Sequence, residues 1–329
     1  MSRAFGFVGV LLLLISCTVQ TPSTFRPQGP AADSISSLWW LLFGLAAFVY
    51  VTVMGVMLYA FFRPRHNAAR NAWFNQNGRY FIIGGGTILP VIILSLIYGS
   101  TLRTLSALKA PTTADALSIE IIGHQWWWEV KYPQEGVTTA NEIHIPVGQP
   151  VTLHLTSNDV IHSFWVPELH GKLDLIPGRT NTFWLQADEP GQFWGLCAEL
   201  CGVQHAKMLF VVVAKPPADL ADWLSQQSQP AVVPSETVVQ RGFEIFMEAN
   251  CDECHVIRGT KADGELGPDL THFADRLTLG AGAGRNSRGN LAGWIVNPHG
   301  LKPGNLMPAA ADISGEDLQA LLAYLETLQ

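Results

Sequence analysis

Two cysteines, a histidine and a methionine lie within twelve residues of the chain, in the stretch "CAELCGVQHAKM". These side chains are Cys197, Cys201, His205 and Met208, and the upstream stretch "DVIHSFWVP" adds His162. Thiolate, imidazole and thioether groups together suit copper, and a mononuclear blue-copper site needs only one thiolate. Two thiolates could bridge two copper ions. The stretch therefore predicts a redox centre that contains two coppers.

Two other uses of the cysteine pair stay open on residue types alone. In an oxidising compartment, two cysteines four residues apart could form a disulfide. Structural zinc takes four nitrogen and sulfur ligands in a tetrahedron, and the two histidines with the two cysteines could supply them. The complete donor set favours copper.

A second motif lies further along the chain. The residues "CDECH" match the C-x-x-C-H pattern by which c-type haem is attached. Cys251 and Cys254 would form the two thioether bonds to the porphyrin, and His255 would be the proximal iron ligand. A thioredoxin-like redox pair also uses C-x-x-C, but the segment lacks a βαβ pattern and belongs to an exported part of the chain. Haem attachment is therefore the prediction.

A sixth iron ligand is also expected. One methionine follows His255, Met307 in "KPGNLMPAA", and His/Met ligation raises the reduction potential of a haem. His272 and His299 are the alternatives for a bis-histidine site. The stretch "GPDLTHF" resembles small cytochromes c, in which the carbonyl at Pro268 would accept the Nδ1 proton of the proximal histidine.

The N-terminus predicts export. The apolar run "FGFVGVLLLLIS" follows Arg3, is too short to span a bilayer and ends at Cys17, which is typical of a secretory signal. The stretch "LLISC" resembles a bacterial lipobox, which implies a signal over residues 1–16 and a lipidated Cys17 as the first mature residue. An uncleaved signal with an ordinary cysteine is the alternative.

Two longer apolar runs predict a transmembrane hairpin over residues 36–100. Leu38 to Phe62 has no charged residue over 25 positions, and Tyr80 to Tyr98 has none over 19. Each run can cross a hydrocarbon core of about 30 Å. The loop between them carries four arginines and no acidic residue, which places it in the cytoplasm and everything after it outside: Arg63, Arg65, Arg70 and Arg79.

Composition agrees with a membrane-anchored protein. Only 14% of the residues are charged and 48% are hydrophobic, and the formal net charge is −7. Thirteen acidic and seven basic residues lie from Ser235 onward, so most of the imbalance falls there. This balance argues against nucleic acid as a partner. An acidic surface could steer a basic protein, or it could be an ordinary solvated face.

The external part divides into three segments. Residues 112–216 contain short runs such as "SIEII", "NEIHIP" and "VTLHLT" bounded by turn residues, which predicts an all-β sandwich. Residues 217–234 are rich in Pro, Gln, Ala and Ser and are expected to be a linker with one short helix. Residues 235–329 carry helical spacing and glycine-rich loops, and Ser314 with Asp317 forms a helix-capping pattern.

These motifs together resemble a known family. The cysteine stretch, "DVIHSFWVP", "IPGR" and "GHQWWW" resemble subunit II of cytochrome c oxidase, over Leu38 to about Lys215. The haem motif narrows the resemblance to the subtype with a cytochrome c fused at its C-terminus. The expected architecture is multi-domain: a two-helix transmembrane hairpin, an all-β cupredoxin-like sandwich and a small all-α cytochrome c domain.

The resemblance implies roles for particular residues. The binuclear copper centre of the family, CuA, would be held by two thiolates, two imidazoles, one thioether and one backbone carbonyl, those of Cys197, Cys201, His162, His205, Met208 and Glu199. The side chain of Glu199 would reach a magnesium site shared with subunit I. Trp126, in "QWWW", would be the ring through which electrons pass to CuA. Three adjacent tryptophans cannot all face one side of a strand, so at least one is expected to be exposed or at an interface.

The implied function is electron transfer within a larger enzyme. Electrons would run from haem c through CuA to subunit I, where oxygen is reduced to water and protons are pumped. Expected partners are subunit I, subunit III, and a soluble cytochrome c or a quinol–cytochrome c reductase upstream. The expected location is the bacterial inner membrane, with both redox domains on the periplasmic side. Ile83 stands where many family members carry a glutamate for proton uptake, which puts that role in doubt.

Two other functions use the same residues differently. A stand-alone membrane-anchored electron-transfer protein could feed a different reductase. The second alternative function is that of a copper-delivery factor. However, a site with two thiolates and two imidazoles should hold copper rather than release it.

Overall fold

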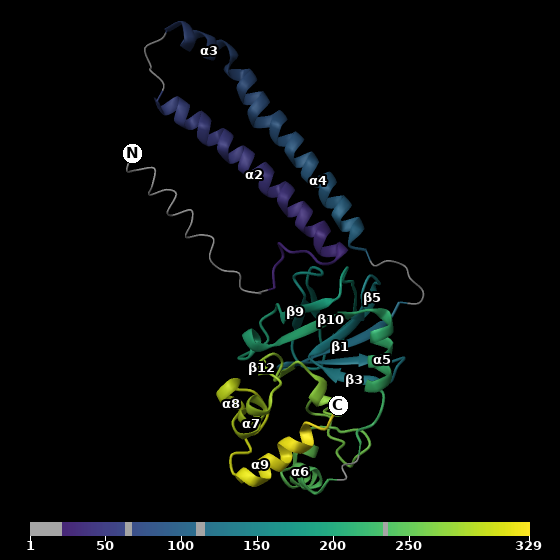
Figure 1. Cartoon of the computed structure of the whole chain (residues 1–329). Coiled ribbons are helices and arrows are strands. Elements are labelled where there is room, and N and C mark those ends of the chain that lie inside the picture. Colours follow the sequence, from purple (N-terminus) through teal and green to yellow (C-terminus); the bar gives the residue numbers. More distant parts are fainter. Residues whose placement is uncertain (1–21, 63–67, 110–115, 233–235) are drawn as a thin grey trace, which may run out of the picture.

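The computed structural model describes residues 22–62, 68–109, 116–232 and 236–329. The expected signal over residues 1–16, the lipidation site Cys17, and Arg63 and Arg65 lie outside these ranges. Figure 1 shows two long helices, then a β-sandwich, then a small helical domain at the opposite end of the molecule. This order confirms the predicted fold class.

The membrane helices are longer than the apolar runs that predicted them. Helix α2 spans Pro30–Phe62, and α3 (Ala68–Ile83), the π-helical turn η2 (Gly84–Ile88) and α4 (Leu89–Ala107) follow one another. The apolar spans have mean hydropathies of 2.3 and 2.2, and none of their most apolar residues is buried. Proline lacks an N–H group, so Pro90 interrupts the helical hydrogen-bond ladder, and the wider π turn lies just before it. These two exposed apolar helices anchor the chain in a membrane.

The outer end of the hairpin is bonded to the sandwich. The N–H of Ala32 donates to the carbonyl of Leu169 (3.2 Å), and the indole N–H of Trp184 donates to the carbonyl of Leu108 (2.9 Å), just beyond α4. A Cβ atom at Gly29 would lie 2.3 Å from a backbone oxygen of the sandwich, so only glycine allows this approach. Both membrane helices are therefore fixed to the sandwich at the same end of the hairpin.

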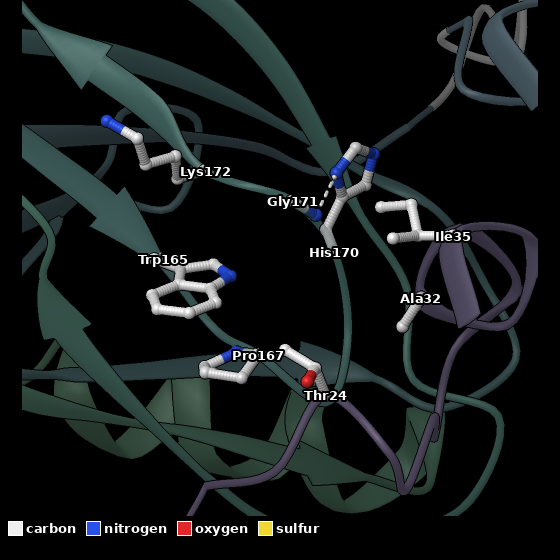
Figure 2. A pocket seen from close by; sticks show the side chains of 8 residues that line it. All are labelled: Thr24, Ala32, Ile35, Trp165, Pro167, His170, Gly171 and Lys172. Atoms are coloured by element: carbon white, nitrogen blue, oxygen red, sulfur yellow. Dashed lines mark hydrogen bonds between the residues drawn. The ribbon is translucent and has the colours of Figure 1, made fainter. Parts of the chain in front are cut away.

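A small cavity of about 210 Å³ lies where α2 meets the sandwich. Figure 2 shows Ala32 and Ile35 of α2 on one side and Trp165 and Pro167 on the other. His170 lies beside it, packed edge-on against two aromatic rings of the sandwich, and burial lowers its pKa to about 4. His170 is therefore a neutral core residue at neutral pH.

The sandwich consists of two five-stranded sheets. The first has the order β3-β2-β1-β5-β8 and the second β4-β10-β9-β6-β7. Strand β1 pairs in parallel with β5, and β10 in parallel with β4, while the other pairs are antiparallel. The strand bounds are β1 Ser118–His124, β2 Trp127–Tyr132, β3 Val137–Ala140, β4 Glu142–Pro146, β5 Val151–Ser157, β6 His162–Trp165, β7 Leu173–Leu175, β8 Asn181–Leu185, β9 Gly191–Cys197 and β10 Leu209–Lys215.

The core between the sheets is aromatic. Successive side chains of β1, β2 and β5 alternate between buried and half-buried, as expected for strands with one face on a core. Trp128, Phe164 and Phe210 meet at ring-centroid distances of 4.6 to 6.1 Å. A Cβ atom at Gly195 would lie 2.1 Å from the Phe210 ring, so this glycine makes the room that Phe210 occupies.

The segment after β10 packs on the sandwich. Residues Pro217–Gln227, expected as the beginning of the linker, form α5. Its Trp223 stacks on His144 at a centroid distance of 3.8 Å and meets Tyr132 edge-on. Because Leu220, Trp223 and Leu224 repeat at helical spacing, α5 presents one apolar face, and that face lies on the sandwich.

The C-terminal domain is helical, as predicted. It contains α6 (Thr237–Glu248), the 3-10 turns η4 (Cys251–Glu253) and η5 (Phe273–Asp275), α7 (Arg288–Val296), α8 (Pro298–Leu301) and α9 (Gly315–Leu325). A short hairpin of β11 (Thr278–Leu279) and β12 (Gly284–Arg285) was not predicted. The hydroxyl of Ser314 accepts the N–H of Asp317 (3.1 Å), so the predicted cap of α9 is present.

Helices α6 and α9 cross closely at Gly242. A Cβ atom there would lie 2.1 Å from the carbonyl oxygen of Ala320 and 2.7 Å from the Cβ of Tyr324. A side chain at this position would push the two helices apart, and their contact is the centre of the domain core.

We expect Gly242→Ala to destabilise the cytochrome domain by about 2 kcal/mol, because overpacking a close contact forces backbone shifts. Gly289→Ala in α7 is the matched control, since a Cβ atom there has no neighbour within 4 Å. Thermal unfolding of the haem-loaded chain would measure both. Equal melting temperatures for the two variants would contradict this account of the crossing.

Candidate copper and haem sites

The copper-type residues lie at one end of the second sheet. Cys197 is the last residue of β9, His162 is the first of β6, and Met208 directly precedes β10. The intervening loop holds Cys201 and a 3-10 turn, η3 (His205–Lys207). The N–H of Cys197 donates to the carbonyl of Met208 (3.0 Å) and closes the loop. The fold therefore gathers ligands from two separated parts of the chain.

The donor atoms surround a pair of sulfurs. The Sγ atoms of Cys197 and Cys201 are 3.7 Å apart, and both cysteines are free. Nδ1 of His162 lies 3.9 Å from the Sγ of Cys197, and Nδ1 of His205 lies 3.8 Å from the Sγ of Cys201. The thioether sulfur of Met208 lies 3.8 Å from the Sγ of Cys201. All five predicted side chains are thus brought together, and a disulfide is absent from this pair.

The two thiols share one proton. A hydrogen bond from Cys201 holds the pKa of Cys197 far below the usual value for a thiol, and His162 adds to the effect. The same interaction raises the pKa of Cys201. A thiolate beside a buried thiol is a site from which a soft cation can displace the proton. The donor chemistry therefore fits copper.

Glu199 contributes to the site through its backbone. Its carbonyl oxygen lies 3.2 Å from the Sγ of Cys197. Its side chain points elsewhere, and the carboxylate lies 3.8 Å from the ammonium of Lys172, with both groups almost half exposed. With the two sulfurs included, six donors gather here, more than the four that a structural zinc ion takes. Two metal ions fit this number better than one.

Asp159 is a site residue that the sequence analysis missed. Its carboxylate lies 2.8 Å from Nε2 of His162 and accepts the N–H groups of Gln125 and Val160, both at 2.6 Å. Burial raises its pKa, but these hydrogen bonds outweigh burial and lower it. The contact leaves Nδ1 of His162 facing the sulfurs. A carboxylate three residues before a predicted histidine ligand was the available signal.

The three adjacent tryptophans lie in different places. Trp128 is buried in the sandwich core, and Trp127 stacks on His124 at a centroid distance of 4.3 Å. Trp126 lies in the turn between β1 and β2, where its indole N–H donates to the carbonyl of Cys201 (3.0 Å). A Cβ atom at Gly202 would lie 3.0 Å from its ring. Trp126 is thus the one in contact with the loop of the sulfur pair.

The haem-type residues follow α6. Cys251 begins the turn η4, and Cys254 and His255 come directly after it. Nδ1 of His255 lies 2.8 Å from the carbonyl oxygen of Pro268, the contact expected from the resemblance. The proton on Nδ1 leaves the lone pair of Nε2 for iron. A Cβ atom at Gly267 would lie 2.6 Å from the imidazole, so this glycine lets the chain pass along the ring.

The candidates for the sixth ligand differ in their surroundings. Met307 is half-buried on the loop after α8, and its N–H donates to the side chain of Asn305 (2.9 Å). His272 is buried, with Nε2 3.0 Å from the carbonyl of Gln229 in the linker, while its Nδ1 has no hydrogen-bond partner among the described residues. His299 lies within the short helix α8. Met307 as the sixth ligand stays a prediction.

The fold and the two sites together define a class: a membrane-anchored electron-transfer protein with a copper domain and a c-type haem domain. Comparison with known proteins agrees. The family described as "Cytochrome C oxidase subunit II, periplasmic domain" matches residues 135–215, and the family "Cytochrome c" matches residues 239–329. These are the domains that carry CuA and haem.

Relatives match over the whole chain. Cytochrome c oxidase subunit 2 of Alkalihalophilus pseudofirmus is 37% identical, covering 100% of this chain and 97% of its own length. The subunit of the same name from Bacillus subtilis is 31% identical, covering 97% and 95%. A crystal structure of the periplasmic domain of subunit II from Bradyrhizobium japonicum is 33% identical, covers 36% of this chain and 96% of its own, and has a TM-score of 0.35. The chain belongs to the cytochrome c oxidase subunit 2 family.

We expect Asp159→Ala to weaken copper retention by about 10- to 100-fold, because a ligating histidine loses the partner that orients it. The intensity of the two-copper near-infrared absorption, followed against a competing chelator, would measure the loss. Asp188→Ala is the matched control, since Asp188 is an exposed aspartate of the same domain. Equal retention in both variants would show that Asp159 has no role at the site.

Proposed function

We propose that this chain collects single electrons at its cytochrome domain and passes them through CuA to the oxygen-reducing subunit of a proton-pumping oxidase. Two observations support the proposal. Relatives named as subunit 2 of cytochrome c oxidase match nearly the full length, and the donor set of CuA is assembled around the cysteine pair. The chain is a subunit of an oxidase complex, and the catalytic site for oxygen belongs to another chain.

The copper ligands in this proposal are the groups gathered around the two sulfurs. They are the side chains of Cys197, Cys201, His162, His205 and Met208 and the backbone carbonyl of Glu199. When bound, the dicopper centre supplies a one-electron carrier whose charge is spread over two metals and two thiolates. The protein contributes rigidity, because the ligands lie on two paired strands and a loop closed by a backbone hydrogen bond.

The haem ligands in this proposal come from the C-terminal domain. Cys251 and Cys254 attach the porphyrin, His255 and Met307 bind its iron, and the Pro268 carbonyl fixes the imidazole. In this proposal the membrane hairpin is residues 36–100 and the copper domain is residues 112–216. The linker is residues 217–234, and the cytochrome domain is residues 235–329. Within this division α5 is the part of the linker that lies on the copper domain.

The proposal also includes a magnesium ion and further protein partners. The carboxylate of Glu199 is almost half exposed while its carbonyl faces the sulfurs, so one residue can serve both CuA and a magnesium ion shared with subunit I. Subunit III, and a soluble cytochrome c or a quinol–cytochrome c reductase, complete the proposed assembly in a bacterial inner membrane. Ile83, at the end of α3, has no group that could take up a proton, so we assign no such role to this position.

We expect Met307→Ala to keep its covalent haem but lose the low-spin His/Met spectrum, because the thioether is the sixth ligand in this proposal. Optical and magnetic spectra of the purified chain would test this. His299→Ala should keep the wild-type spectrum. A normal spectrum for the methionine variant, or its loss in the histidine variant, would refute the ligand assignment.

We expect Trp126→Phe to slow reduction of CuA by haem c by about tenfold, because the contact with the Cys201 carbonyl is lost and the path is displaced. Time-resolved absorption after rapid reduction of the haem would give the rate. Trp127→Phe, at the first position of β2, is the matched control. Unchanged rates in the Trp126 variant, with copper still bound, would contradict the proposed electron path.

A further inference from the structure

Two buried charges cross between the copper domain and the cytochrome domain. Lys302 belongs to the cytochrome domain and Glu142 to the copper domain, and their exposed fractions are 2% and 3%. Both reach backbone groups of the opposite domain. The contacts are therefore reciprocal. Each domain supplies one charged side chain, and its backbone binds the charged side chain of the other domain.

The ammonium of Lys302 holds the turn that carries Trp126. It donates to the carbonyl of Trp126 (2.8 Å) and to the carbonyl of Gly280 in its own domain (3.1 Å). Burial lowers the pKa of Lys302 to about 8, which leaves it charged at neutral pH. The indole of Trp126 donates in turn to the carbonyl of Cys201. One residue thus separates Lys302 from a proposed copper ligand.

The same lysine lies on the loop that leads to the proposed iron ligand. Met307 is five positions further along, and Asn305 connects the two, since its side chain donates to the Lys302 carbonyl (2.8 Å) and accepts the N–H of Met307 (2.9 Å). Lys302 therefore joins the loop of the haem domain to the turn of the copper domain by a continuous set of hydrogen bonds.

Glu142 makes the second crossing at another part of the contact. Its carboxylate accepts the N–H groups of Leu277 (2.5 Å) and Thr278 (3.4 Å), at the start of β11. On the other side it faces His144 at 3.7 Å. Glu142 thus holds the β11–β12 hairpin of the haem domain against the edge strand β4.

The backbones of the two domains also approach each other closely within this contact. The N–H of Leu209 donates to the carbonyl of Ala281 (3.0 Å), and a Cβ atom at Gly282 would lie 2.7 Å from the Cβ of Leu209. At the rim, the ammonium of Lys207 donates to the carbonyl of Leu301 (2.8 Å). The two domains therefore meet along a surface that begins at the CuA loop.

Buried charges set the geometry of a contact more than its strength. Removing a charge from water is costly, and its hydrogen bonds recover that cost only when the geometry is right. Any other arrangement of the two domains that covered Lys302 or Glu142 would leave a charge unpaired, which is a strong penalty against that arrangement. These two residues thus discriminate between one docked arrangement and its alternatives.

We propose that Lys302 and Glu142 are positioning residues that hold the haem domain in one docked arrangement on the copper domain, with the Met307 loop next to Trp126. This inference deepens the proposed function, because the arrangement brings the two redox sites together. It does not depend on electron transfer, and it can be tested on the contact itself.

The test is amide hydrogen exchange on the full chain in its purified oxidase complex. The N–H groups of Leu209, Leu277 and Thr278 are bonded across the contact and report its opening. We expect Lys302→Ala to speed their exchange by about tenfold or more, because the Trp126 carbonyl loses its partner. Lys261→Ala, at an exposed lysine of the same domain, should exchange like the wild type.

The glutamate offers a conservative pair of variants. Glu142→Gln keeps an oxygen that can accept the two N–H groups and should retain most of the protection. Glu142→Ala removes the acceptor and should lose protection at Leu277 and Thr278 by about tenfold. Equal exchange rates at Leu277 and Thr278 in the two variants would overturn the role of Glu142.

Electron transfer provides an independent second readout. Lys302→Ala should slow reduction of CuA by haem c by about tenfold, while the copper and haem spectra keep the features of intact ligand sets. Wild-type exchange at the three amides in Lys302→Ala would overturn the inference. So would faster exchange throughout α6 and α9, which would make Lys302 a folding residue. A third outcome is faster exchange at the three amides with an unchanged rate of CuA reduction. That result would confirm the docking and refute the proposed electron path instead.

Discussion

Two sulfur atoms, 3.7 Å apart and shielded from water, set the main constraint on this molecule. Two thiolates so close cannot both carry charge unless a cation lies with them, so the pair keeps one proton until metal arrives. The arrangement also demands a rigid backbone. Strands β6 and β9 are paired, and the loop after β9 is closed at Met208. The sandwich is the scaffold that makes this pairing of sulfurs possible.

The rest of the chain holds the sandwich between the membrane hairpin and the haem domain. The membrane hairpin is bonded to it at the start of α2 and just beyond the end of α4, so the copper domain is held at one end of the hairpin. On the far side, the haem domain lies against the CuA loop and the turn at Trp126. A membrane protein that receives electrons from outside and delivers them inward needs this order of parts.

Sequence reasoning reached the parts of this design that are encoded locally. Ligand types and spacing predicted the cysteine pair and the haem motif, and long apolar runs predicted the hairpin. Asp159 was missed because its role depends on a contact between side chains rather than on a motif. Lys302 and Glu142 were missed because 160 positions separate them in the chain, and only the tertiary structure makes them neighbours of the opposite domain. The packing of α5 was also missed, since its helical apolar face lies in a segment whose composition is typical of a linker.

The chain that follows α5 leads directly to the haem domain. Arg258 donates to the carbonyl of Ser228 (3.2 Å), and the N–H of Ala231 donates back to the carbonyl of Arg258 (2.9 Å), so this stretch of the linker lies on the haem domain. Soluble redox partners find each other through long-range charge, which physiological salt screens beyond about 8 Å. A donor already held in place has no such encounter to make. Its internal step is unimolecular, and neither dilution nor ionic strength should change its speed.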